Sequence, residues 1–488
     1  MIYEGVPIRY WGRKPIRLAK GFIRRFSNEG EIVLDAFGGS GTFIKAALGL
    51  QRRAIYIDLN PFAELIAHST IGGCSAERLE KAVQKILSRY TLPIKSKNRV
   101  KTVPRSKVFS VKCTCGQPIE AKYVVFTKFY RAFHKTEPNV TGLMKEIYFV
   151  IARKKKITHE ELLKHFMNYN SRIISYSIKW LVKNNLIREE EKPIKVFYNI
   201  PCRCGRRFRR LTEDPWVIKS PIIPAYWYPK NKLYYKGKIP FLKKRDASSI
   251  DGFFLDRSLA LLSGIWKDIQ DLKVERDVKY CLQLAFMATL IRSSKMCRLC
   301  GGTWPINSYW IPRQYVVRNP YLIFKLATDR ILKILKGRQH IVNCGEVDDV
   351  IRKKADVSFM LADSTKIKLP KESVDYVIVD PPHTDEVQFF ELSLFYTAWL
   401  KKNLDFRNEI VINPRQQKDL NYYLYMLKKA SEKIHYALKP GRYYTVILHE
   451  ENQRVLNACM ETILTVGFSI VSRNKIGDYT VYTFRKIG

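Results

Sequence analysis

The stretch EIVLDAFGGSGTFIKAALGLQRRAIYIDLN (31–60) predicts two buried strands with a helix between them. One apolar run ends at Asp35 and a second ends at Asp58, which is the pattern of strands that lie inside a sheet. The glycine-rich turn at 38–41 lets the backbone approach a ligand closely where the first strand gives way to the helix. A strand, a helix and a second strand in this order form a βαβ unit, so we expect two parallel strands.

A second group of strands follows about 300 residues later in the chain. Strands that alternate with helices predict an α/β fold in which a mostly parallel sheet is covered on both faces. We expect the last two strands to form an antiparallel edge, and the sheet to be split in sequence by a long insertion. The predicted strands are VSFMLAD (357–363), SVDYVIVD (373–380), GRYYTVILHE (441–450), FSIVSRNK (468–475) and YTVYTFRK (479–486), with a helix at 452–467.

The composition indicates a partner that carries negative charge. The 488 residues have a net charge of +41, and a chain this basic is expected to bind phosphate polyanions or an anionic membrane surface. No apolar run approaches the roughly 18 residues of a spanning helix, and the first residues lack the apolar region of a signal peptide. We therefore expect a soluble, cytoplasmic protein that binds nucleic acid and no membrane.

The length predicts two to four domains, because domains typically contain 100 to 200 residues. We place the boundaries at 1–75 and 341–488 for the two halves of the α/β domain, at 76–250 for a basic insertion, and at 251–340 for a helical segment. Residues 101–250 hold 33 Lys and Arg against 11 Asp and Glu, a net of +22, while the other 338 residues carry the remaining +19. The insertion is therefore the candidate for gripping a polyanion.

Part of the insertion resembles a winged helix-turn-helix. Three helices are expected within 141–185, followed by a short hairpin at 186–200. The last helix would present Arg172, Ser175 and Lys179 outside, and such a helix commonly enters the major groove of DNA. A small helical packing module is the alternative interpretation.

The segment 297–320 mixes aromatic residues with arginines, among them Arg313 and Arg318. Such mixing can serve base stacking and phosphate contact. It is equally typical of an ordinary structured loop, so both interpretations stay open.

Two short cysteine motifs predict a metal site. KCTCG (112–116) and PCRCG (201–205) place four thiols at Cys113, Cys115, Cys202 and Cys204. Four thiolates are the ligand set of a tetrahedral structural Zn²⁺, and close cysteine pairs in an intracellular chain indicate metal ligands more often than disulfides. Four buried, reduced thiols are the alternative.

The run VDYVIVDPPHTDEV (374–387) buries a strand, ends it at Asp380 and continues with two prolines. Pro381 and Pro382 fix their own φ angles and restrict the residue before them. The result is a stiff turn that holds one carboxylate and one backbone carbonyl in a set place. Acids that end neighbouring parallel strands, such as Asp35 and Asp58, lie where open α/β sheets bind ligands. Asp58 is placed to hold ribose hydroxyls, a feature that NAD-binding domains share.

An Asp-Pro-Pro strand end together with a DxFxGxG turn resembles the amino-methyltransferases that use S-adenosylmethionine. The family signature (D/N/S)PP(Y/F/W/H) corresponds to Asp380, Pro381, Pro382 and His383, which the resemblance makes the catalytic residues. The carboxylate and the Pro381 carbonyl would hold the target amine, and His383 would stack on the extruded base. His in place of the usual Tyr is the main departure. The implied fold is a Rossmann-like class I methyltransferase sheet, split by an insertion that holds a zinc ribbon, a winged-helix-like module and a helical segment.

The same resemblance implies a cofactor site in the first half of the sheet. The segment YWGRKP (10–15) precedes the glycine turn, where DNA amino-methyltransferases place the residues that cap the methionine end of the cofactor. The stretch 380–400 is similar to adenine-specific DNA methylases that contain a zinc ribbon. The expected cofactor-binding residues are Lys14, Pro15, Asp35, Phe37, Gly39, Gly41, Thr42, Asp58, Asn60 and Asp363.

These observations predict an S-adenosylmethionine-dependent DNA methyltransferase that acts on an exocyclic amine, with adenine N6 favoured. Cytosine N4 and RNA amines would use the same groups, and a winged-helix DNA-binding regulator without activity is the non-enzyme alternative. Cytosine-C5 methyltransferases are disfavoured, because they need a nucleophilic Cys after the Pro where Asp380-Pro381 stands. DNA is the expected partner, and a restriction endonuclease is the further partner that the resemblance implies.

Overall fold

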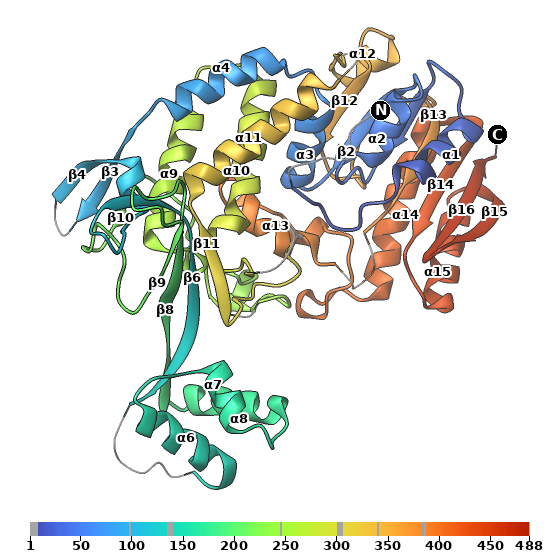
Figure 1. Cartoon of the computed structure of the whole chain (residues 1–488). Coiled ribbons are helices and arrows are strands. Elements are labelled where there is room, and N and C mark those ends of the chain that lie inside the picture. Colours follow the sequence, from blue (N-terminus) through green and yellow to red (C-terminus); the bar gives the residue numbers. More distant parts are fainter. Residues whose placement is uncertain are drawn as a thin grey trace.

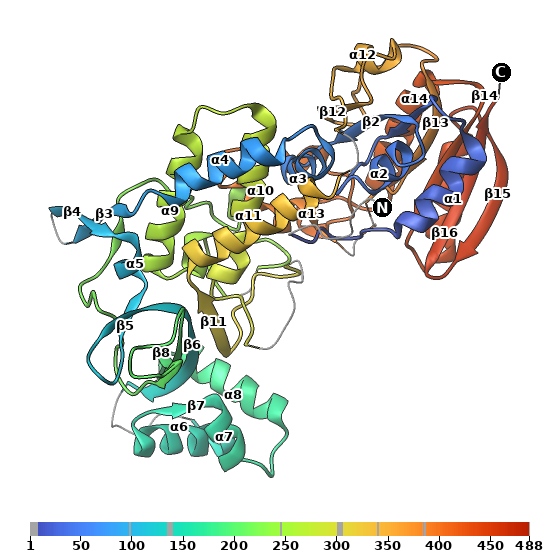
Figure 2. The ribbon, with the colours of Figure 1, turned by 45° about the horizontal axis from the view of Figure 1, so that its top comes forward.

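The computed structural model describes residues 8–96, 99–133, 140–244, 246–299, 306–338, 341–382, 384 and 387–487. Figure 1 shows a sheet covered by helices at one end of the molecule, a group of helices beside it, and a long arm that carries further helices at its tip. The turned view in Figure 2 shows the same order, with the helical group between the sheet and the arm.

The central sheet has seven strands and contains both sequence halves. β1 pairs with β2 and β13, and the pairing of Val33 with Tyr376 joins segments more than 340 residues apart. β16 runs antiparallel to β14 and to β15, as predicted for the edge. The order is β12 (Val357–Leu361), β2 (Arg53–Asp58), β1 (Ile32–Asp35), β13 (Val374–Val379), β14 (Leu438–Leu448), β16 (Tyr479–Lys486) and β15 (Phe468–Ile476). This mostly parallel sheet with an antiparallel edge confirms the predicted α/β class.

Helices cover both faces of the sheet because successive strand residues point to opposite sides. Val33, Tyr56 and Tyr376 pack on one face against α1, α2 and α3, whereas Leu34 and Ile55 pack on the other face against α12, α14 and α15. These helices are α1 (Ile16–Phe26), α2 (Thr42–Leu48), α3 (Pro61–Ile71), α12 (Val347–Ile351), α14 (Leu420–Ala437) and α15 (Gln453–Leu464).

The segment 251–340 is mostly helical, as expected, and packs with helices from both neighbouring segments. It contributes α9 (Asp256–Asp271), α10 (Arg276–Ser293) and α11 (Pro320–Lys336), which share one core with α4 (Ala76–Leu87) and α13 (Phe389–Thr397). It also contains a strand, β11 (Gln314–Arg318), which pairs with β6 of the insertion. The segments on the two sides of the predicted boundary at residue 250 therefore share a sheet. The boundary itself stays a prediction.

The insertion is built on two long strands, β6 (Pro118–Ala132) and β8 (Ile187–Tyr198), which pair along most of their length. The predicted short hairpin at 186–200 is wrong, because β8 is one strand whose partner lies more than 50 residues upstream, beyond the reach of a local pattern. The remaining strands are β3 (Thr91–Ser96), β4 (Arg99–Pro104), β5 (Ser110–Lys112), β7 (Ile157–Thr158), β9 (Phe208–Arg210) and β10 (Ile223–Pro224), beside the short helix α5 (Arg105–Val108).

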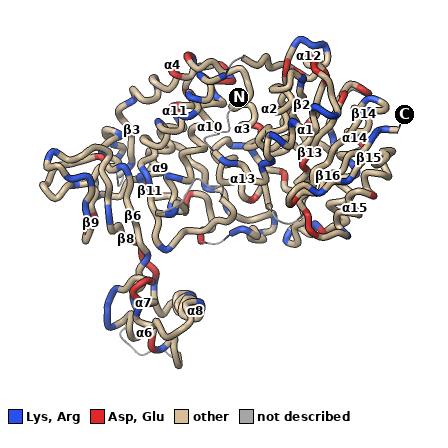
Figure 3. The backbone as a smooth tube through the Cα atoms, turned by 45° about the vertical axis from the view of Figure 1, so that its right-hand side comes forward, with Lys and Arg blue, Asp and Glu red and all other residues tan. Residues whose placement is uncertain are grey.

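Three helices form the unit at the tip of the arm: α6 (Gly142–Lys154), α7 (His159–His165) and α8 (Ser171–Lys183). Thr158 caps α7 through a reciprocal capping box with Glu161. The Asn170 side chain caps α8 by accepting a hydrogen bond from the Arg172 N–H. Single 3₁₀ turns lie at Lys236–Lys238, Asp251–Phe253, Phe406–Asn408 and Pro414–Gln416. Figure 3 shows Lys and Arg distributed along the arm and the tip unit. No helix within the described ranges has the length and apolar character that crossing a bilayer requires.

Candidate functional site

A cavity of about 110 Å³ opens at the carboxyl ends of the parallel strands. One acid lies at the end of each of four strands: Asp35 is the last residue of β1 and Asp58 of β2, while Asp363 follows β12 and Asp380 follows β13. Parallel strands bring their carboxyl ends to one edge of the sheet, which is where open α/β sheets bind ligands. The structure thus brings together acids that are up to 345 residues apart in the chain.

The glycine turn closes one wall of this cavity. The Gly39 N–H donates to Asp58 Oδ2 over 2.7 Å, and its φ of +48° lies in the left-handed region. A Cβ at Gly39 would lie 3.5 Å from the Tyr10 ring. Gly41 has a φ of +77° and does not line the cavity, and a Cβ there would come within 2.7 Å of Ile71 Cδ1. Gly41 therefore permits close packing of the turn on α3.

Asp58 and Asn60 hold the next wall. The Asn60 N–H donates to Asp58 Oδ1 over 2.7 Å, and the Asn60 side-chain amide donates to Tyr10 Oη over 3.2 Å and to Ser393 Oγ over 2.6 Å. Burial raises the pKa of the Asp58 carboxyl to about 6, against the lowering effect of the Asn60 and Gly39 N–H groups. Asn60 thus fixes the positions of the groups around Asp58.

Asp35 is almost completely buried at the end of β1. Burial raises the pKa of its carboxyl well above the usual value, the Phe37 N–H opposes this, and the negative charges of Asp58 and Asp380 add to the rise. Asp363 accepts hydrogen bonds from the Thr365 hydroxyl at 2.7 Å and N–H at 2.9 Å.

Asp380 forms an ion pair with Lys14, and Lys14 Nζ lies 2.6 Å from Asp380 Oδ2. The Lys14 side chain is 2% exposed and that of Asp380 is 17% exposed. Lys14 Nζ also lies 4.8 Å from the centre of the Tyr479 ring at the start of β16. Pro381 and Pro382 line the same cavity. The stiff turn therefore presents its carboxylate next to a buried ammonium group.

Several lining residues are missing from the expected set. Tyr10 and Phe389 stack with ring centroids 5.9 Å apart, and Phe390 and Glu409 lie beside them. The Phe390 N–H donates to Glu409 Oε1 over 2.8 Å, and burial raises the pKa of Glu409 to about 7. Tyr10 and the two Phe residues lie in motifs that the sequence singled out, whereas Glu409 follows no motif.

Glu391 follows Phe389 and Phe390 in the chain and connects α13 to the insertion. Its carboxylate accepts hydrogen bonds from the Leu242 N–H at 3.0 Å and the Lys243 N–H at 2.9 Å, and from the Tyr235 hydroxyl. Glu391 is completely buried. Glu391 thus holds the insertion against α13, the helix that follows Asp380 in the chain.

Most of the predicted catalytic and cofactor residues meet in the cavity. Pro15 and Gly41 are not among the lining residues, and Pro15 precedes α1. His383 lies outside the described residues. The predicted residues that line the cavity are Lys14, Asp35, Phe37, Gly39, Thr42, Asp58, Asn60, Asp363, Asp380, Pro381 and Pro382.

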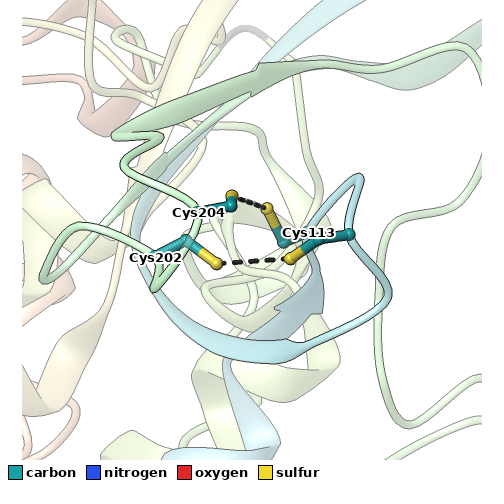
Figure 4. Close-up of side chains that lie close together, drawn as sticks. Cys113, Cys202 and Cys204 are labelled. Carbon is teal, nitrogen blue, oxygen red and sulfur yellow. Dashed lines mark hydrogen bonds between the residues drawn. The ribbon is translucent and has the colours of Figure 1, made fainter.

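The two cysteine motifs at 112–116 and 201–205 form two turns, which we call the knuckles. Their four cysteines converge from separate segments, as Figure 4 shows for Cys113, Cys202 and Cys204. Cys113 Sγ lies 3.6 Å from Cys204 Sγ, and Cys115 Sγ lies 3.5 Å from Cys202 Sγ. All four sulfur atoms lie within 4.8 Å of one another. The glycine that follows each second cysteine has a positive φ. Four thiols at this separation fit a tetrahedral metal ion.

The predicted nucleic-acid residues fall into two places. Arg172 and Lys179 are exposed on α8, and the Arg313 guanidinium donates to Ser175 Oγ over 2.9 Å, so the tip unit touches the loop before β11. Arg318, at the other end of β11, donates to Cys297 Sγ over 2.6 Å.

Comparison with known proteins agrees with this geometry. Residues 8–69 match the N6/N4 methyltransferase family model, which is described as DNA methylase. The resemblance to DNA methylases is therefore confirmed. The chain is 24% identical over 237 residues to the Type II methyltransferase M.MjaII of Methanocaldococcus jannaschii, across 46% of this chain and 43% of that methylase. The chain thus spans less than half the length of this curated relative.

Solved structures align over parts of the chain. The fibrillarin pre-rRNA processing protein of Methanococcus jannaschii is 15% identical, over 33% of this chain and 53% of its own, with a TM-score of 0.17. A 1,6-didemethyltoxoflavin-N1-methyltransferase of Burkholderia thailandensis, with bound S-adenosylhomocysteine, is 13% identical over 28% of this chain and 54% of its own, with a TM-score of 0.17. At such scores these alignments carry no argument, and the methylase resemblance rests on the family match and the curated relative.

The cavity fits the cofactor of DNA methylases. Gly39 has no side chain to fill the space beside Tyr10, and Asp58 offers a carboxylate of the kind that holds ribose hydroxyls. Asp363 follows β12, the strand that pairs with β2 in the sheet. The donor set therefore suits S-adenosylmethionine.

Proposed function

We propose that this protein is an S-adenosylmethionine-dependent DNA methyltransferase that methylates an exocyclic base amine, with adenine N6 as the target. The observation that carries the proposal is that the Asp380-Pro381 turn lines the same cavity as the glycine turn and Asp58. A group that binds an amine thus lies next to a group that suits the methyl donor. The family match over residues 8–69 supports the same conclusion.

The chemistry follows from the properties of the amine. The lone pair of an exocyclic amine is delocalised into the ring, so the nitrogen is a weak nucleophile. Hydrogen bonds from the amine to the Asp380 carboxylate and the Pro381 carbonyl would favour a pyramidal nitrogen with an available lone pair. The cofactor, when bound, supplies a methyl group on a sulfonium. The base would have to leave its helix to enter the cavity.

The cofactor-binding roles proposed for individual residues follow from their places in the cavity. Asp58 would hold the ribose hydroxyls, Asp363 would face the adenine, and Asp35 with Phe37 would flank the methionine end. Asn60 would act through its bonds to Tyr10 and Ser393. Lys14 acts on Asp380 in this structure, which makes it a positioning residue in our proposal.

The insertion would provide target recognition and a structural metal. Cys113, Cys115, Cys202 and Cys204 would hold Zn²⁺, which would fix the two knuckles together. The unit of α6, α7 and α8 would act as a helix-turn-helix-like module. Its last helix would contact duplex DNA through Arg172 and Lys179.

The decisive experiment is to incubate the protein with methyl donor and duplex DNA, single-stranded DNA or RNA, and to identify the modified base by digestion and mass spectrometry. N6-methyladenine in DNA is expected. N4-methylcytosine would change the target base, a methylated RNA amine would change the substrate class, and no product on any substrate would refute the enzyme.

The role of Asp380 is tested by Asp380→Asn. Loss of the carboxylate should lower transfer by about 10²- to 10⁴-fold, while S-adenosylhomocysteine affinity, measured by calorimetry, stays within a few-fold. Asp329→Asn, an exposed acid on α11, is the matched control and should transfer normally. Equal activity of both variants would contradict the role of Asp380.

A further inference from the structure

Three aromatic rings form a row across the sheet of β11, β6, β8 and β9. Tyr123 of β6 pairs with Phe197 of β8, and Phe197 pairs with Phe208 of β9. Residues directly opposite each other on paired strands project to the same face. The ring centroids are 4.5 Å apart for Tyr123 and Phe197, and 5.6 Å apart for Phe197 and Phe208. The three side chains therefore make one continuous aromatic row.

Cations flank and overlie this aromatic row. Arg318 of β11 pairs with Tyr123, and its guanidinium carbon lies 5.9 Å from the Tyr123 ring centre. Lys195 Nζ lies 4.8 Å from the ring centre of Phe197 and 4.4 Å from that of Phe208. Arg210 of β9 pairs with Lys195 and so projects to the same face, and residues 195–212 contain six Lys and Arg and no Asp or Glu.

The two faces of this sheet have different surroundings. Val124, Val196 and Val317 point to the other face and belong to the large core shared with the central helices. On the face of the aromatic row, Phe208 is 47% exposed, and Tyr123 and Phe197 are half-buried. A large aromatic side chain that stays accessible beside several cations is suited to a partner that offers both aromatic ring faces and negative charge.

We propose that this aromatic row is a binding site for single-stranded nucleic acid, in which an unpaired base stacks on Phe208, the exposed end of the row, while the surrounding cations bind phosphates. Base stacking on aromatic side chains along a positively charged surface is how proteins hold single strands without reading sequence. In a duplex the faces of the bases are covered by their neighbours, so a duplex would engage only the cations. The site is separate from the methyl-transfer cavity and goes beyond the proposed function.

The test is fluorescence anisotropy with the full-length protein and a labelled mixed-sequence DNA oligonucleotide, offered as a single strand and as a duplex, without methyl donor. Phe208→Ala should weaken single-strand binding by about 5- to 100-fold, the range expected for loss of one stacked base. Duplex binding should change less than about twofold. Phe208→Tyr keeps a ring and should restore single-strand binding.

Two further variants make the test specific. Tyr425→Ala removes a similarly exposed ring, 55% exposed on α14, and should leave binding unchanged. Lys195→Gln should weaken the binding of both single-stranded and duplex DNA and lower the salt dependence of binding, because one phosphate contact is lost. Equal losses on single strand and duplex for Phe208→Ala, no loss, or equally tight Phe208-dependent binding of a polyglutamate peptide would overturn the proposal.

Because no methyl donor is present, this test does not depend on the proposed function. If binding of single strands depends on Phe208 but the protein methylates no substrate, the binding site is supported and the proposed enzyme activity is refuted. If the protein transfers methyl groups but its single-strand binding does not depend on Phe208, the enzyme activity is supported and the binding site is refuted.

Discussion

Lys14 and Asp380 form an ion pair with a distance of 2.6 Å between Nζ and Oδ2, although 366 residues separate them in the chain. The contact joins the segment before α1 to the end of β13, so it connects the N-terminal and C-terminal parts of the chain that line the cavity. A carboxylate has about four acceptor positions on two oxygens. Asp380 can therefore keep Lys14 on Oδ2 and still accept a hydrogen bond from an amine.

The first prediction concerns this ion pair. Lys14→Met should lower methyl transfer by at least about tenfold, because removing one member of a poorly exposed pair leaves the other charge uncompensated. Lys14→Arg keeps the charge and should retain more activity than Lys14→Met. The measurement is single-turnover transfer alongside calorimetry with S-adenosylhomocysteine. A loss of cofactor affinity that accounts for the whole effect would assign Lys14 to the cofactor instead of Asp380.

The second prediction concerns pH and Asp58. Burial raises the pKa of this carboxyl to about 6, and the ionised form is the better acceptor for ribose hydroxyls. S-adenosylhomocysteine affinity should therefore rise as pH increases up to about 6, and level off above it. Asp58→Asn should bind more weakly and lose this dependence. A wild-type affinity that is constant between pH 5 and 7 would contradict the role of Asp58.

For stability the sign of the Asp58 effect is opposite. A raised pKa means that the folded protein binds the proton more tightly than the unfolded chain does, so this group stabilises the fold at low pH. That contribution is lost as pH rises from the unfolded value near 4 to about 6. Asp58→Asn should thus be relatively more stable than wild type at pH 7 than at pH 4, as measured by denaturant unfolding.

The third prediction concerns the cysteine cluster. Purified protein should contain about one Zn²⁺ per chain, and Cys204→Ser should lower that content because a tetrahedral site loses one of four ligands. Chelation should make the knuckles at 112–116 and 201–205 sensitive to protease, with the seven-stranded sheet still folded. Cys344→Ser is the control, since Cys344 lies outside the cluster. Metal-free protein of unchanged stability would rule out the zinc site.

The fourth prediction separates two glycines. Gly41→Ala should destabilise the fold by about 1–3 kcal/mol, because φ is +77° and the new Cβ would come within 2.7 Å of Ile71. Gly21→Ala lies within α1 with nothing within 4 Å of the new Cβ, and should stabilise by about 0.5–1 kcal/mol. Denaturant unfolding measures both changes. Equal effects of the two substitutions would contradict the packing role of Gly41.

The fifth prediction concerns duplex binding by α8. The double variant Arg172→Ala and Lys179→Ala should lower the salt dependence of duplex binding by about two phosphate contacts. The matched control removes Lys428 and Lys433, which are exposed on α14. Anisotropy titrations over a range of salt concentrations give both slopes. The same slope for the two double variants would remove α8 from the duplex interface.

Local patterns predicted the strands because a short, mostly apolar run that ends at a polar turn is recognisable as a buried strand. Asp35, Asp58 and Asp380 could be placed at strand ends, and parallel strands then put them at one edge. The same reasoning failed for residues 186–200, where the strand β8 pairs with a distant partner rather than with itself. Glu409 could not be found either, because nothing beside it in sequence marks its place at the cavity.

The sequence by itself determined the α/β class, the acids at the strand ends, the stiff Asp-Pro-Pro turn and the two close cysteine pairs, because each depends on residues near one another in the chain. Only the tertiary structure decided that Lys14 faces Asp380, that Asn60 bonds to Tyr10 and Ser393, and that Tyr123, Phe197 and Phe208 form one aromatic row. These relationships depend on strand register and helix packing, which sum many weak contacts over the whole chain. No short stretch of sequence contains that sum.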